Sequence, residues 1–216
     1  RLYYFDFLVR QLKRSGSRIG IRLGSVAELD AIIPRGLGML GKVPGKKAIG
    51  VGWTLEDTFN ISIGQGGLRQ SPLQMACMIA KLGSNDLSFQ PSILHREGKT
   101  TAPPKPLGIT PEDRQTILEG MHLATTDGTA HRCKIEGIDI AGKTGTGQWR
   151  NHNMKLNLAW FVGFAPVEKP EVAIAVLIEG IIPQDKIQGG LTATPVARDI
   201  LKAYFEKLGN RLARSE

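Results

Sequence analysis

The sequence predicts an α+β fold in which an antiparallel sheet is flanked by helices. Three segments with strand-like patterns follow one another in the C-terminal half, and only a short turn separates the last two. Helical patterns come before and after this group. Because parallel strands need a long crossover whereas antiparallel strands need only a turn, the order of elements favours a sheet packed against helices over alternating βαβ units.

The helices before the strands begin with a capping pattern. Ser71 is followed by Pro72, and Thr110 by Pro111, so each hydroxyl can accept a hydrogen bond from the first turn. Gly83 supplies a stop for the first of these helices. The helices expected along the chain are 3–13, 72–83, 111–124 and 194–208, with at most a short one at 25–32.

The last helix is expected to cover the sheet with an apolar face. This face consists of Val196, Ile200, Leu201, Tyr204 and Leu208. Residues 15–47 are broken up by glycine and proline and are expected to form mainly loop. The expected strands are 137–146, 157–165 and 171–179, together with a short strand at 90–96.

Length and composition are those of one globular domain, or most of one. The chain has 216 residues, of which 41% are hydrophobic and 22% charged. Its net charge of +8 points to anionic surroundings. The basic residues are spread along the chain, however, and no basic stripe interleaved with aromatic residues occurs. We therefore expect a solvated basic surface and no nucleic-acid partner.

Neither a metal nor another cofactor is expected. Cys77 and Cys133 lack the spacing of a metal or redox site, so both are expected to be structural. The histidines lack ligand spacing as well. They are His95, His122, His131 and His152.

No segment has the length of a membrane span. The longest apolar run, residues 173–178, is far shorter than the ~20 residues that cross a bilayer. The sequence begins at Arg1 without a charged leader, an apolar stretch and a cleavage site. Any anchor or export signal is therefore expected upstream of Arg1.

A glycine-rich segment offers two interpretations. Gly137 to Thr144, reading GIDIAGKT, satisfies the GxxxxGK[ST] pattern of a phosphate-binding loop. Such a loop follows a buried strand and enters a helix whose N-terminus faces the phosphates. Here the residues after Thr146 begin no helix, and Ile138 and Ile140 alternate with polar or small neighbours as in a half-buried strand. Nucleotide binding is therefore the weaker interpretation.

The stronger interpretation is an edge strand that lines an acyl-transfer cleft, because KTG is a motif of penicillin-interacting serine enzymes. Lys143 would hold a substrate carboxylate and bias the proton network of the serine, and the hydroxyls of Thr144 and Thr146 are available for hydrogen bonding. Gly145 lets a peptide-like substrate lie along the strand. The Thr146 amide can point at the developing oxyanion, a contact worth about 3 kcal/mol in the transition state.

Further motifs accompany KTG in a fixed order between about Ala48 and Phe205. They are Trp53, EDTFNISIGQG (56–66), SPLQMA (71–76), EGM (119–121), GTA (128–130), AGKTGT (141–146), AWFVGFAP (159–166) and Gly189-Gly190. In this order they resemble the class B penicillin-binding proteins of the elongation type. The resemblance implies the fold shared by penicillin-binding transpeptidases and serine β-lactamases, here incomplete, with residues 1–216 as the C-terminal portion of a single transpeptidase domain.

The resemblance also implies an activity for the intact protein. In that family a serine attacks the penultimate D-Ala carbonyl of a peptidoglycan stem peptide, releases D-Ala and passes the acyl group to an amine, and β-lactams mimic the acyl donor. The implied partners are stem peptides ending in D-Ala-D-Ala, β-lactams and membrane proteins of the elongation complex. The implied location is the extracytoplasmic face of the bacterial inner membrane. Gln65 is then either a substrate contact or part of a loop that supports the cleft.

One half of the expected active site is missing from the sequence. No SxxK, TxxK or SxN occurs, so the chain is expected to be inactive alone. Ser84-Asn85-Asp86 has the SxD form of the second motif, but it follows the IGQG stretch that the family places after that motif, so a loop that ends a helix is expected. A serine β-lactamase or penicillin-sensing domain, which shares KTG, and a noncatalytic peptide-binding module are the alternatives.

Overall fold

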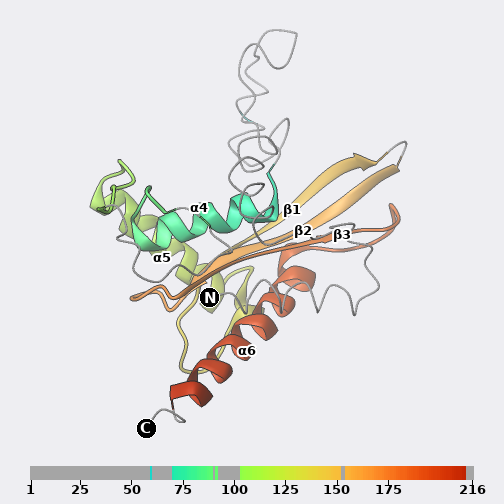
Figure 1. The fold of residues 1–216 in the computed structure, drawn as a ribbon. Coiled ribbons are helices and arrows are strands. Elements are labelled where there is room, and N and C mark those ends of the chain that lie inside the picture. Colours follow the sequence, from blue (N-terminus) through green and yellow to red (C-terminus); the bar gives the residue numbers. More distant parts are fainter. Residues whose placement is uncertain (1–58, 60–69, 90, 92–102, 152–153, 213–216) are drawn as a thin grey trace, which may run out of the picture.

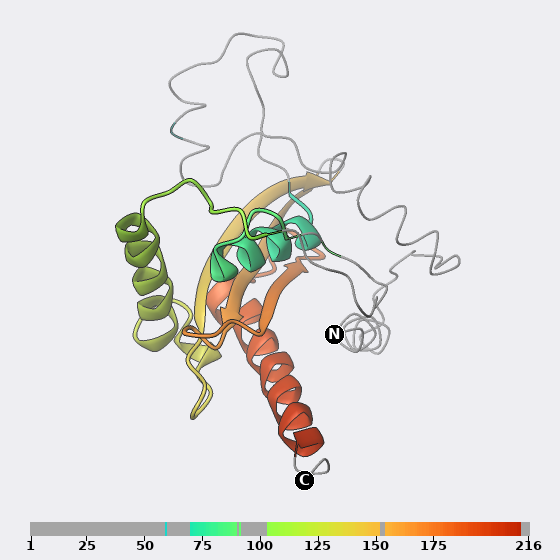
Figure 2. The same ribbon diagram turned by 60° about the vertical axis from the view of Figure 1, so that its left-hand side comes forward.

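The computed structural model of the chain describes residues 59, 70–89, 91, 103–151 and 154–212. Within these residues a three-stranded antiparallel sheet carries helix α4 on one face and helix α6 on the other, and helix α5 lies beside the first strand (Figure 1). Figure 2 shows the same two layers of helix from a second direction. The predicted α+β architecture is confirmed.

Helix α4 (Pro72–Ser84) begins where the capping pattern predicts. The Ser71 hydroxyl accepts a hydrogen bond from the Gln74 amide, and the Gln74 side chain accepts one from the Ser71 amide, which completes a capping box. The predicted stop at Gly83 is wrong. The helix runs on to Ser84 and ends at Asn85, which adopts the left-handed conformation (φ 53°) that asparagine tolerates. Gly83 is instead a buried packing position.

Helix α5 (Pro111–Thr126) is capped by Thr110, whose hydroxyl accepts from the Asp113 amide. It extends two residues beyond the predicted end. From this helix the Arg114 guanidinium donates to the Leu82 carbonyl and, at 2.8 Å, to the Gly83 carbonyl. These are carbonyls of the last turn of α4, which lack partners inside the helix, so Arg114 caps one helix from the other.

The sheet has the order β1-β2-β3 among the described residues. Strand β2 (Met154–Ala165) lies between β1 (Ala141–Asn151) and β3 (Val172–Glu179), and both of its neighbours run antiparallel to it. Residues 157–165 and 171–179 were expected as strands, and both expectations are confirmed within three residues at each end. The turn between β2 and β3 contains a cis peptide bond at Ala165-Pro166.

The first strand is displaced from its predicted position at 137–146. Residues 135–138 form a tight turn in which Gly137 adopts φ 74° and Ile138 bridges back to Ile135, and residues 139–140 lead from this turn into the strand. The alternation of Ile138 and Ile140 imitates a strand because a turn against a core also buries selected apolar side chains. The strand itself starts at Ala141 and continues five residues beyond Thr146.

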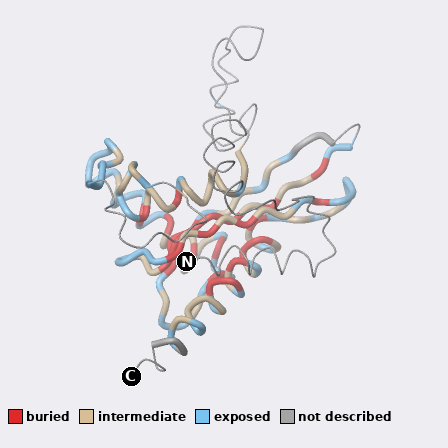
Figure 3. Tube along the Cα trace, viewed as in Figure 1, coloured by how far each residue is buried: buried red, intermediate tan, exposed pale blue. Residues whose placement is uncertain are grey.

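The two faces of the sheet pack into separate hydrophobic clusters. Alternation along β2 sends Phe161 into the cluster beneath α6 and Phe164 into the cluster beside α4 and α5, and both rings are buried. Figure 3 shows the buried positions concentrated along the strands and at the beginning of α6. Core packing is therefore confirmed as the role of the AWFVGFAP strand.

Helix α6 (Thr194–Leu212) begins at the predicted Thr194 and follows a π-helical turn, η2 (Gly189–Ala193). Ile200 and Leu201 are buried against the sheet as expected. Val196 was assigned to the same face but is 40% exposed. Ala197, one position further along the helix, is fully buried, so the first turn of α6 directs Ala197 rather than Val196 toward the sheet.

Some expectations lie outside the described residues. These are the helices at 3–13 and 25–32, the loop-rich segment 15–47, the strand at 90–96 apart from Pro91, the EDTFNISIGQG stretch apart from Phe59, and the candidate contact Gln65.

Candidate active site

The KTG motif lies in the middle of a strand, opposite β2. Lys143 pairs with Val162, Thr144 with Phe161 and Gly145 with Trp160. Ala141 and Gly142 are buried, whereas Lys143 and Thr146 are exposed. The strand therefore emerges from the core as it reaches the motif.

The phosphate-loop interpretation is wrong. Gly137 and Ile138 belong to a tight turn, and the residues that follow enter a strand rather than a helix, with Gly142 to Thr144 as strand residues. The backbone amides of a strand alternate in direction, so they cannot converge on a phosphate as those of a phosphate-binding loop do.

The motif presents different groups on the two faces of β1. Residues directly opposite each other in an antiparallel pair share a face. Lys143 is paired with Val162 and therefore lies on the face that carries α4, and Gly145 lies on the same face opposite Trp160. Thr144 and Thr146 lie on the face that carries α6. The Lys143 ammonium donates to the Thr144 carbonyl oxygen at 2.7 Å.

A turn from outside the sheet contacts Thr144. The GTA residues follow α5, and the Thr129 hydroxyl lies 2.8 Å from the Thr144 hydroxyl. The turn is closed by hydrogen bonds from the Ala130 amide to the Ala124 carbonyl and from the His131 amide to the Gly128 carbonyl. The position of Thr129 is thus fixed by the end of α5 and by the turn that follows it.

A second segment contacts β1 from the α6 face. The Gly189 amide donates to the Thr146 hydroxyl at 3.4 Å, and the buried Thr194 hydroxyl donates to the Gly189 carbonyl at 2.9 Å. A methyl group on Gly189 would lie 2.6 Å from the Gly145 carbonyl oxygen. The backbone of η2 therefore packs directly against the backbone of β1, with no room for a side chain between them.

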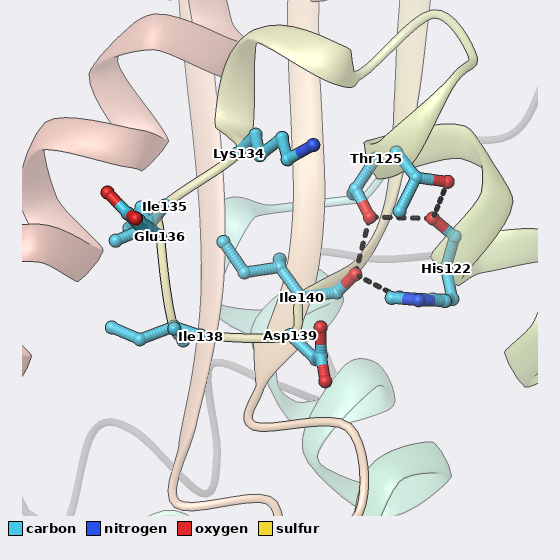
Figure 4. A pocket seen from close by; sticks show the side chains of 10 residues that line it. His122, Thr125, Lys134, Ile135, Glu136, Ile138, Asp139 and Ile140 are labelled. Carbon is cyan, nitrogen blue, oxygen red and sulfur yellow. Dashed lines mark hydrogen bonds between the residues drawn. The ribbon is translucent and has the colours of Figure 1, made fainter.

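A pocket of about 200 Å³ lies next to the beginning of β1 (Figure 4). On one side of the pocket the Thr125 hydroxyl and the His122 ring both contact the Ile140 carbonyl oxygen, at 2.5 Å and 3.3 Å. These contacts hold the residue just before β1. The pocket is lined by His122, Thr125, Thr126 and residues 134–140.

The SxD sequence at the end of α4 is the helix-ending loop that was expected. The Ser84 hydroxyl donates back to the Ala80 carbonyl at 2.7 Å. One oxygen of Asp86 accepts from the Ser88 hydroxyl at 2.6 Å and from the Lys105 amide at 3.0 Å. These bonds lower the pKa of the Asp86 carboxyl below its usual value, the Ser88 hydroxyl contributing most. Asp86 therefore ties residues near 105 to the end of α4.

Both cysteines are free thiols in the described part of the chain. Cys133 is fully buried, and burial raises its pKa to about 12, against a small opposing effect of the Arg198 charge. Burial also raises the pKa of Cys77, which lies in α4. The expectation that both are structural is consistent with these environments.

The sequence identified the residues of the β1 site but not their contacts. GTA and Gly189-Gly190 were noted only as members of an ordered set of motifs, and nothing in the local sequence connects them with KTG. Among the described residues no group of three potential metal ligands lies together. Nor does that part of the chain contain a helix both long enough and apolar enough to cross a membrane.

Comparison with known proteins identifies relatives. Residues 34–202 match the family described as "Penicillin binding protein transpeptidase domain". The chain is 29% identical over 155 residues to "Peptidoglycan D,D-transpeptidase PbpA" of Mycolicibacterium smegmatis, a match that covers 68% of this chain and 31% of the relative.

Solved structures agree with this assignment. The complex between penicillin-binding protein PBP2 and MreC from Helicobacter pylori matches with a TM-score of 0.59 at 26% identity, covering 79% of this chain and 31% of that one. The ceftriaxone acyl-enzyme complex of penicillin-binding protein A from Mycobacterium tuberculosis matches with a TM-score of 0.54 at 26% identity, covering 67% and 34%. The chain spans about a third of the length of these three proteins. It therefore belongs to the penicillin-binding protein transpeptidase family, among the class B members of the elongation type, as the resemblance predicted.

Proposed function

We propose that these residues are the C-terminal portion of a peptidoglycan D,D-transpeptidase domain and that β1 forms one wall of its acyl-transfer cleft. The observation that carries the proposal is the position of KTGT in β1, which has one neighbour among the described strands and so forms the outer edge of the described sheet. The Lys143 side chain is exposed there. A strand edge is the surface on which an extended peptide binds by adding a strand.

Each residue of the motif has a role in this proposal. The Lys143 ammonium holds the terminal carboxylate of the stem peptide and biases the proton network of the nucleophilic serine. The Thr144 and Thr146 hydroxyls complete the hydrogen bonds to the substrate. Gly145 carries no side chain that would obstruct a peptide along β1, and the Thr146 amide stabilises the oxyanion. Gln65 is proposed as a further contact of the cleft.

The serine that forms the acyl-enzyme is not among the 216 residues, since they contain no SxxK. The proposed activity is therefore that of the whole protein, acting on stem peptides that end in D-Ala-D-Ala and acylated by β-lactams. The relative solved as a ceftriaxone acyl-enzyme complex supports β-lactams as ligands, and the relative solved in complex with MreC supports a partner in the elongation complex. The proposed site of action of the whole protein is the extracytoplasmic face of the inner membrane.

The test is acylation of the full-length protein by a fluorescent penicillin. Lys143→Ala should lower the acylation rate about 100-fold, the size of effect that loss of one electrostatic contact has in acyl-transfer sites. Because Lys143 is exposed, the melting temperature should not change. The matched control is Lys155→Ala, an exposed lysine on β2, which should acylate at the wild-type rate.

Three outcomes would contradict the proposal. Lys143→Ala could acylate as fast as the Lys155→Ala control. The 216-residue chain alone could form a stable adduct on any serine. Rapid turnover of nitrocefin by the full-length protein would indicate a β-lactamase instead of a transpeptidase.

A further inference from the structure

The hydroxyl of Thr144 has a partner that the known motif does not include. We propose that Thr129 is a positioning residue for the acyl-transfer site, which it serves by orienting the Thr144 hydroxyl, and that η2 supports the same stretch of β1. The inference rests on the proposed function, because it requires that Thr144 face the substrate.

The hydroxyl pair restricts what Thr144 can do. Thr129 Oγ1 and Thr144 Oγ1 lie 2.8 Å apart, the usual length of a hydrogen bond between hydroxyls. A hydroxyl has one proton and two acceptor positions, so bonding to Thr129 determines which of them remains for a substrate. Threonine is also restricted at χ1, and a partner on one side selects one of its rotamers. Thr129 therefore fixes both the direction of the Thr144 hydroxyl and its remaining capacity for hydrogen bonds.

The backbone that carries Thr129 is itself held in place. A methyl group on Gly190 would overlap the Thr129 carbonyl oxygen, and one on Gly189 would lie 2.5 Å from the Trp160 carbonyl oxygen. The turn after α5, β1 and η2 therefore meet backbone to backbone. Because Thr194 at the start of α6 bonds to the Gly189 carbonyl, this contact is continuous with the α6 side of the core.

The environment of Thr129 is that of a support rather than of a core residue. Thr129 is exposed, so loss of its hydroxyl leaves no buried cavity. The contact with Thr144 spans 15 residues of sequence and joins the turn after α5 to β1. A small displacement of a substrate-facing group is costly in catalysis, and here one hydrogen bond opposes that displacement.

The experiment measures acylation of the full-length protein by a fluorescent penicillin. Thr129→Val keeps the shape and removes the hydroxyl, and it should lower the acylation rate about tenfold, the effect of one lost hydrogen bond. Thr129→Ser restores a hydroxyl and should recover most of the rate. The matched control is Thr116→Val, whose hydroxyl bonds within α5 at 2.9 Å and should leave the rate unchanged.

A double-mutant cycle separates positioning from a general structural effect. In a Thr144→Val background, Thr129→Val should have no further effect on acylation, because the group that it orients is gone. Equal effects of Thr129→Val in both backgrounds, or a wild-type rate for the single variant, would overturn the inference while leaving the proposed function intact. If the wild-type full-length protein is not acylated at all, the proposed function fails, and the inference fails with it.

Discussion

The face of the sheet covered by α6 and the face covered by α4 differ in how extensively they are packed. The α6 face packs a broad cluster that includes the buried Phe161, Leu201 and Cys133. The α4 face packs a smaller described cluster, where Trp160 is only partly buried, and this face carries the exposed Lys143. Thr144 and Thr146 project from the well-packed side, where neighbouring segments hold them. The charged group of the motif thus lies on the open face and its hydroxyls on the supported face.

The largest effect should come from the α6 face. Phe161→Ala should lower the free energy of unfolding by about 3–5 kcal/mol, because it removes a fully buried ring and leaves a cavity. Urea unfolding of the full-length protein measures this loss. The control is Ile181→Ala, which removes an 82% exposed side chain and should change stability by less than about 0.5 kcal/mol. Similar losses of unfolding free energy for the two variants would contradict the prediction that the Phe161 ring is packed in the core and the Ile181 side chain is not.

An intermediate effect is expected on the α4 face. Arg114→Ala should cost about 1–3 kcal/mol, because it leaves the carbonyls at the end of α4 without the guanidinium that caps them. Arg198→Ala is the matched control, since the Arg198 guanidinium bonds to the exposed Asp199 next to it and such surface pairs contribute little. If both variants unfold at the same urea concentration, the Arg114 contacts do not join α4 to α5 in solution.

The smallest effect is expected in the rates at which the two thiols are alkylated, since Cys77 lies in α4 and Cys133 lies in the cluster on the α6 face. At pH 8 iodoacetamide should modify Cys77, in the half-buried surface of α4, well before Cys133, whose pKa is raised to about 12 by burial. Because this folded-state pKa exceeds the usual thiol value of 9.0, the stability it contributes is present below about pH 9 and is lost as the pH rises toward 12. Peptide mass analysis after brief labelling measures the order. Faster labelling of Cys133 would show that the α6 side opens first.

The local parts of this fold could be predicted from the sequence. Both helices that begin at Ser-Pro or Thr-Pro start where their caps indicate, because a cap is a contact within four residues. The end of α4 could not be assigned in the same way. Gly83 is the stronger stop signal by composition, but the structure uses it for close approach to the Phe164 ring and stops the helix at Asn85.

In the candidate site, too, the local motif could be predicted from the sequence but the features that depend on distant segments could not. KTG and its chemical character could be read from the sequence, whereas the end of β1 could not, since Gln148 to Asn151 lack an apolar alternation and are strand residues only because β2 pairs with them. The contact between Thr129 and Thr144 is likewise a product of packing between distant segments. Ordered motifs indicated that these residues belong together, but only the fold shows which atoms meet.

The edge position of β1 among the described strands has a consequence for solubility. A strand edge that can accept a peptide can also accept the same strand of another molecule, which leads to aggregation. Lys143 opposes this because two copies of β1 paired across their edges would bring like charges together, and the glycines at 142, 145 and 147 weaken the intrinsic tendency of the segment to form a strand. The lysine proposed to attract a substrate carboxylate would thus also keep the protein from pairing with itself.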